Sequence, residues 1–85
     1  MTEKKLDEMV ENIVKVIDFD NEKYIGILHK VTQYVVKIKD KEYPVNINNG
    51  YLLECFDKNI IFRKSHIKKC SIYKSPQGIS LKEFL

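Results

Sequence analysis

The residues best suited to chemistry in this sequence lie between positions 57 and 74. Six basic side chains stand there against one acidic residue, Asp57, with the aromatic residues Phe62 and Tyr73 interleaved among them. The basic residues are Lys58, Arg63, Lys64, Lys68, Lys69 and Lys74. Basic side chains release counterions from a phosphate backbone, and flat aromatic rings stack on unpaired bases. The stretch is therefore typical of a surface that binds single-stranded nucleic acid.

The same composition has a structural interpretation. Lysines keep a small β-protein soluble and protect its strand edges, while aromatic side chains fill its core.

Charge is unevenly distributed along the chain, because residues 1–22 hold three basic and seven acidic side chains, whereas residues 23–74 hold eleven basic and four acidic ones. An acidic first segment on a basic body fits a protein that turns one face to a polyanion.

The sequence offers little that indicates catalysis. His29 and His66 are its two histidines, no HxH or HExxH spacing is present, and the three glycines are too scattered for a dinucleotide or phosphate loop. Cys55 and Cys70 lie in apolar, strand-like contexts, so we expect two reduced thiols rather than a disulfide or a metal pair. We therefore expect a non-enzymatic protein without metal or cofactor.

The elements that position these residues belong to one domain, residues 1–85, which is 44% hydrophobic and 32% charged. No apolar run is long enough to span a bilayer, and the N-terminus lacks the features of a signal peptide, so we expect a cytoplasmic protein without membrane contact. A chain this short buries only about 60% of its unfolded surface. Self-association is therefore expected to add stability.

The first segment predicts a helix over residues 1–13. Thr2 suits the N-cap position, and apolar residues from Leu6 onwards recur at helical spacing. The pattern continues to Ile17, but the β-branched residues in this region also suit a strand. The helix boundary therefore stays open, with an earlier end near Asn12 as the alternative.

Residues 14–74 predict short antiparallel strands. Runs of β-branched and aromatic residues alternate with turn formers at Asp20-Asn21, at Thr32-Gln33 and at residues 48–50, which read NNG. Five or six such strands favour a small, strongly bent antiparallel β-barrel that hides its own edges. The expected fold is thus mainly β with one N-terminal helix, and the apolar tail at residues 75–85 is expected to pack on the barrel or on a neighbouring copy.

Residues 14–40 resemble the first half of the signature of the Sm-like fold, especially that of the bacterial RNA-chaperone family Hfq. Asp20-Asn21 occupies the position of that family's Asn-Gly type turn, and Gly26 occupies the glycine of its G-x-[IL] step. Residues 31–36, which read VTQYVV, align with its Phe-Asp-Gln-Phe-Val-Val element. The resemblance implies a small Sm-like or SH3-like barrel in which Gly26 lets a strand bend sharply.

Residues 60–73, which read IIFRKSHIKKCSIY, resemble the second half of that signature. The family has a Tyr-Lys-His-Ala-Ile segment between its last two strands. Aligned on Ile67, this segment puts Lys64 in the lysine position and Ser65 in the histidine position, with His66 one place later. The resemblance therefore implies that this connection contributes to a ligand site.

In the Hfq family these two elements form a uridine-binding pocket around the central pore of a ring. By resemblance Gln33 would bind a base edge, Tyr34 would stack on the base, and Lys64 would face phosphate. Structural roles stay open: Tyr34 in the core, Gln33 in a turn, and His66 as a cap. The candidate RNA-binding residues are Gln33, Tyr34, Arg63, Lys64, His66 and Lys68.

Residues 41–59 depart from the family pattern, because they insert an extra hairpin where ring-forming relatives pair strands between subunits. Single-stranded RNA or another nucleotide ligand is the expected partner, together with further copies of the same chain, for which a ring is one arrangement. The alternative function is a protein-interaction module or small inhibitor that contacts a protein partner through the extra hairpin and the apolar tail.

Overall fold

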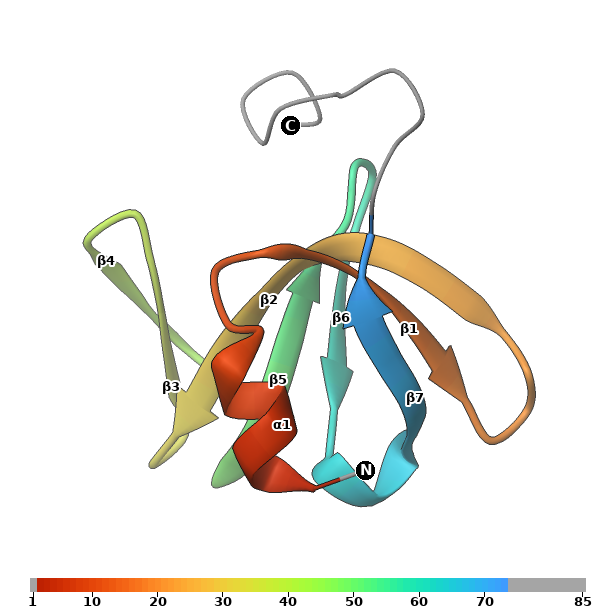
Figure 1. Ribbon diagram of the computed structural model, residues 1–85. Helices are drawn as coiled ribbons and strands as arrows, with labels where there is room; N and C mark the ends of the chain where they lie inside the picture. The colour runs from red at the N-terminus through yellow and green to blue at the C-terminus, as the bar shows by residue number, and fades with distance from the viewer. Residues whose placement is uncertain (1, 74–85) are drawn as a thin grey trace.

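The computed structural model describes residues 2–73 and contains one short helix and one antiparallel sheet of seven strands in that range (Figure 1). The predicted mainly β fold with an N-terminal helix is confirmed, while the tail predicted at residues 75–85 lies outside the described residues. The elements are α1 (Glu3–Glu8), β1 (Ile13–Asp18), β2 (Lys23–Thr32), β3 (Val35–Ile38), β4 (Lys41–Pro44), β5 (Asn49–Glu54), β6 (Asn59–Phe62), the 3₁₀ turn η1 (Lys64–His66) and β7 (Ile67–Ile72).

Helix α1 is shorter than the helix predicted over residues 1–13. Thr2 caps it as expected, because its side-chain oxygen accepts a hydrogen bond from the Lys5 backbone N–H at 3.3 Å. The helix ends at Glu8, and the chain then turns through Glu11, whose φ is 71°. The β-branched residues from Ile13 onwards join the sheet, so the strand preference prevails there. No helix in residues 2–73 has the length and hydrophobicity required to cross a membrane.

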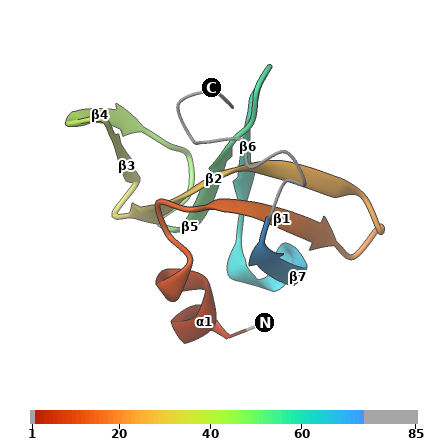
Figure 2. The same ribbon diagram turned by 45° about the horizontal axis from the view of Figure 1, so that its top comes forward.

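Strand β2 organises the sheet. Its first half pairs with β1, its second half pairs with β5, and its last two residues also pair with β3. Beyond these neighbours, β7 pairs with β1, β6 pairs with β5, and β4 pairs with β3. The long curve of β2 in Figures 1 and 2 lets one strand serve both parts of the sheet.

Gly26 lies where β2 changes partners. It pairs with Val14 of β1, and a Cβ atom at this position would overlap the backbone carbonyl of Glu54 in β5. The sequence predicts a glycine here because the strand must bend. The structure shows a different reason, since the β5 backbone approaches so closely that only glycine fits.

The sheet does not close into a barrel within the described part of the chain. Along the path β7-β1-β2-β5-β6 the two end strands, β6 and β7, share no pairing. The prediction that the sheet hides its own edges is therefore wrong, since β4, β6 and β7 each pair on one side only. The cause is local: η1 separates β6 from β7, and β7 then pairs with β1 rather than returning along β6.

The extra hairpin predicted within residues 41–59 is rearranged. β4 and β5 both fall in that range, but β4 pairs with β3 and β5 pairs with β2. The predicted NNG turn is also displaced, because Asn49 and Gly50 already belong to β5 and the bend lies at residues 46–48. The projecting hairpin is therefore β3–β4, seen beside the rest of the sheet in Figure 1.

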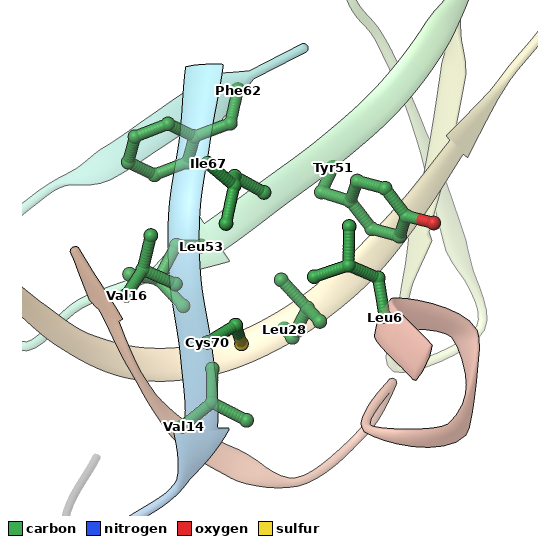
Figure 3. Packing of buried hydrophobic residues seen from close by; sticks show 9 residues of the cluster. All are labelled: Leu6, Val14, Val16, Leu28, Tyr51, Leu53, Phe62, Ile67 and Cys70. Carbon is green, nitrogen blue, oxygen red and sulfur yellow. The ribbon is translucent and has the colours of Figure 1, made fainter. Parts of the chain in front are cut away.

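The main core joins α1 to the sheet. Leu6 of α1 is fully buried and packs in one cluster with side chains from five strands, β1, β2, β5, β6 and β7 (Figure 3). These are Val14, Val16, Leu28, Tyr51, Leu53, Phe62, Ile67 and Cys70. Cys70 and the half-buried Cys55 are free thiols, and burial raises the pKa of Cys70 to about 11.

A second apolar cluster forms on the β3–β4 side of the sheet. Along β5, Tyr51 and Leu53 pack in the main core, whereas Leu52 packs in this second cluster. Because neighbouring side chains on a strand point to opposite faces, the two clusters lie on the two faces of β5. The buried members of the second cluster are Val31, Val36, Ile47 and Leu52.

Candidate nucleic-acid interface

The basic turn between β6 and β7 presents its side chains to solvent. Arg63, Lys64 and His66 are exposed, while the next residue, Ile67, is buried in the main core and anchors the turn. The His66 backbone N–H donates to the Arg63 carbonyl oxygen at 2.9 Å, which closes a single 3₁₀ turn. One short, anchored turn thus carries three side chains that can meet a phosphate backbone.

Strand β7 extends this basic surface. Lys68 and Lys69 are both exposed, and β7 has a free edge because it pairs only with β1. The Lys68 ammonium donates to the Asn21 side-chain oxygen at 3.0 Å, a neutral partner that orients the side chain. Arg63, Lys64, His66 and Lys68 are thus exposed within six consecutive residues, and we call this group the basic turn.

Gln33 and Tyr34 form the turn between β2 and β3. Their φ values are 51° and 64°, and positive φ at both central residues is the feature of a type I′ hairpin turn. The Tyr34 N–H donates to the Asn48 carbonyl at 3.3 Å, and the Tyr34 carbonyl accepts from the Val45 N–H at 2.8 Å. Asn-Gly is the preferred pair for such a turn, and a residue with a Cβ is disfavoured there by about 1–2 kcal/mol.

Both turn residues are exposed, and the Tyr34 side chain has 54% of its surface free. Tyr34 is therefore not a core residue. Its ring has a face on which an unpaired base can stack, and the neighbouring Gln33 amide can both donate and accept hydrogen bonds.

The two candidate groups lie at the same end of the molecule, on either side of α1 in the view of Figure 1. Within residues 2–73 no hydrogen bond or ion pair joins Gln33 or Tyr34 to the basic turn. One chain therefore brings the basic residues together and keeps Gln33 and Tyr34 as a separate group. A ligand that touches both groups must pass beside α1 or bridge two copies.

No ion pair in the described part of the chain involves the basic turn. The ion pairs found there all involve His29 or Lys30. Two carboxylates lie near the turn, because Asp18 and Asp20 line a pocket together with His66. Arg63, Lys64 and Lys68 are exposed and form no ion pair with the described residues, so their charges can meet an external anion, as a phosphate-binding surface requires.

The acidic residues of α1 are partly neutralised by Lys30. Its ammonium lies 2.8 Å from a carboxylate oxygen of Glu3 and 2.8 Å from one of Asp7, and the Tyr51 hydroxyl donates to Asp7 at 2.6 Å. Partial burial raises the pKa of Asp7, but hydrogen bonds from Lys30 and Tyr51 outweigh it and hold that pKa below its ordinary value. Burial, followed by the hydrogen bond to Asp7, raises the pKa of Tyr51 to about 12.

Sequence reasoning missed the buried polar contact at His29. The ring is 3% exposed, with Nε2 3.0 Å from a Glu54 carboxylate oxygen and Nδ1 3.4 Å from one of Glu11. A histidine within an apolar strand was the only signal, because pairing with Glu54 depends on the β2–β5 register, which no local pattern predicts. No group of three potential metal ligands was found among residues 2–73.

Comparisons with protein-family models, with curated proteins and with solved structures found no match to this chain.

Proposed function

We propose that the protein is a non-enzymatic, Sm-like protein that binds single-stranded RNA as a homo-oligomer. The observation that carries the proposal is the basic turn, which is exposed, is anchored by Ile67 and forms no ion pair among the described residues. Exposed aromatic and basic side chains at one end of a small β-sheet are the combination that single-stranded nucleic acid uses.

Several features of the fold support an Sm-like relationship. An N-terminal helix precedes β1, the bent strand β2 carries Gly26 at a close backbone approach, and a one-turn connection precedes the last strand. The sequence resemblance implies the same three features in the same order. The β3–β4 hairpin is an addition to this plan.

The oligomer is part of the proposal because the sheet has free edges. β6 and β7 lie at opposite ends of the path β7-β1-β2-β5-β6, so the edge of one copy can pair with the other edge of the next. Such head-to-tail pairing closes a ring if the rotation between copies permits it. It would also allow Gln33 and Tyr34 of one copy to share a ligand with the basic turn of a neighbour.

The proposed roles follow from side-chain chemistry. Arg63, Lys64 and Lys68 contact phosphates, His66 adds a hydrogen bond or a charge, Tyr34 stacks on a base, and Gln33 binds a base edge. The hydroxyls of RNA and the flexibility of an unpaired strand favour such splayed-out recognition.

Fluorescence anisotropy with labelled U-rich and A-rich oligoribonucleotides tests these roles. We expect Tyr34→Ala to weaken binding by about 1–3 kcal/mol through loss of stacking. We expect Lys64→Ala to weaken binding to both sequences and to lower the dependence of affinity on salt by about 0.7 in the logarithmic slope.

Lys41→Ala is the matched control, because Lys41 is an exposed lysine at the tip of the β3–β4 hairpin, which stands at the left of the sheet in Figure 1, whereas the basic turn precedes β7. Equal losses for Lys41→Ala and Lys64→Ala would contradict a localised interface. No detectable binding by the unmodified protein at low salt would overturn the proposal and leave the protein-interaction function.

A further inference from the structure

A groove lies on the face of the sheet that carries the second apolar cluster. Its volume is about 530 Å³, and its walls come from β3 and β4 on one side and from β5 and β6 on the other. This volume is within the range of ligand-binding clefts. The apolar residues that line it include Val36, Ile38, Tyr43, Val45, Leu52 and Ile61.

The groove is apolar but incompletely covered. Leu52 is buried in its floor, whereas Tyr43 and Ile61 on its walls are 45% and 36% exposed. Exposed apolar side chains that converge on a concavity mark a surface that another chain segment covers. β4 and β6 each have a free strand edge in this region, so an extended segment would also find backbone partners there.

We propose that residues 79–85 of the same chain occupy this groove. These residues follow β7 after a short spacer that contains Pro76 and Gly78, and they read ISLKEFL. Their apolar members, Ile79, Leu81, Phe84 and Leu85, supply the side chains that an apolar groove of this size selects.

The pairing of the strands shows that the segment can reach the groove. Ile72 at the end of β7 pairs with Val14, Val14 pairs with Gly26, and the next residue of β2 pairs with Glu54, which lines the groove. Three steps between neighbouring strands correspond to about 15 Å. The seven residues from Ile72 to Ile79 extend to about 23–25 Å, so they span this distance without being fully stretched.

Attachment to β7 favours this segment over any separate partner. A short connection gives the tethered segment an effective concentration of about a millimolar, far above that of a free peptide or a second copy in dilute solution. The proposal is independent of RNA binding, because the groove lies at β3–β6 and contains no residue of the basic turn.

Methyl NMR of the full-length protein tests the proposal. We expect nuclear Overhauser contacts between the methyl groups of Ile61 and those of Leu81 or Leu85. The double variant Leu81→Ser, Phe84→Ser should remove these contacts and shift the groove methyl resonances, whereas the control Ser80→Ala should leave them in place. No contact between the segment and the groove in the unmodified protein would overturn the proposal.

A mixed sample of differently labelled chains distinguishes docking of the segment within one chain from docking between two copies. Contacts that appear only between differently labelled copies would overturn the proposal in favour of exchange with a second copy. A peptide of residues 74–85 provides a second readout. It should bind the double variant at least 10-fold more tightly than the unmodified protein, whose own segment competes, and equal binding to both would contradict the proposal.

Discussion

At the scale of single residues, the structure shows contacts that the sequence pattern does not specify. Gly26 was identifiable in the sequence because a glycine stood at a step where a strand had to bend, and the structure adds the neighbour that requires it, the Glu54 carbonyl. His29 and Glu54 were not identifiable, because their contact joins residues 25 positions apart through the strand register. Tyr34 allows both a core and a surface interpretation from the sequence, and only its exposure in the folded chain separates them.

Gly26→Ala is expected to lower the free energy of unfolding by about 1–3 kcal/mol, because the new methyl group must displace the β5 backbone. Urea unfolding followed by circular dichroism measures this loss. Ser71→Ala, at an exposed position of β7, is the control and should change stability by less than about 0.5 kcal/mol. An unchanged midpoint for Gly26→Ala would show that the close approach does not exist.

The lowered pKa of Asp7 predicts that the stability of the fold depends on pH. Its pKa is lower in the folded protein than its ordinary value of 3.8, so the carboxylate stabilises the fold at pH values above 3.8. This contribution disappears as the pH falls through the lowered folded pKa. Between pH 7 and about pH 2 the unmodified protein should therefore lose more stability to acid than Asp7→Asn does.

Urea midpoints of both proteins at the two pH values measure the difference. Glu8→Gln, an exposed acid of the same helix, serves as the control and should leave the acid sensitivity in place. Equal acid sensitivity in Asp7→Asn and the unmodified protein would exclude the contact with Lys30 and Tyr51 as its source.

At the scale of elements, the sequence predicted the kinds of element more successfully than their ends and partners. Strands were recognisable because β-branched and aromatic runs alternate with turn formers. The helix was overextended because the apolar spacing from Leu6 continues into Ile13, where a strand preference competes. The NNG segment predicts a turn, but Gly50 belongs to β5, where a Cβ would crowd Ile47 and the Phe62 backbone.

The β2–β3 turn predicts a conflict between stability and binding. Replacing Gln33-Tyr34 by Asn-Gly should raise the free energy of unfolding by about 1–2 kcal/mol, since both positions have positive φ. The same change should weaken RNA binding, because it removes the stacking ring and the base-binding amide.

Replacing Lys39-Asp40 by Asn-Gly in the β3–β4 turn is the matched control. These residues also have positive φ, at 50° and 66°, so stability should rise in the same way while RNA affinity stays nearly constant. Urea unfolding and fluorescence anisotropy on both variants give the comparison. RNA affinity that is unaffected by the change at Gln33-Tyr34 would remove that turn from the interface.

At the scale of the whole molecule, sheet closure and the apolar groove were the features least accessible to sequence reasoning. The number of short strands predicts that edges must be covered, but not whether one chain covers them itself. The groove arises from side chains of four strands that meet only in the folded sheet. The basic turn was accessible because its residues are neighbours in sequence.

The free edges of β6 and β7 predict self-association. Light scattering on a sizing column should give a mass several times the 10.1 kDa of one chain at micromolar concentration. Ile61 pairs with Leu52 at a position where the backbone N–H points away from β5, because the hydrogen-bonded pairs alternate from Cys55 and Lys58. Ile61→Pro, which removes this donor from the free edge of β6, should lower that mass if β6 pairs between copies. A uniform monomer would contradict the oligomer and with it a site shared between neighbouring copies.

The salt dependence of oligoribonucleotide binding tests the central claim most directly. If Arg63, Lys64 and Lys68 of the basic turn each neutralise one phosphate, the logarithm of the affinity should fall with a slope of about −2.1 against the logarithm of salt. Between about 50 mM and about 200 mM salt, the affinity for a U-rich oligoribonucleotide should then fall about 20-fold. An affinity that does not change over this range, or no binding at the lower salt concentration, would contradict a function in which the basic turn binds RNA.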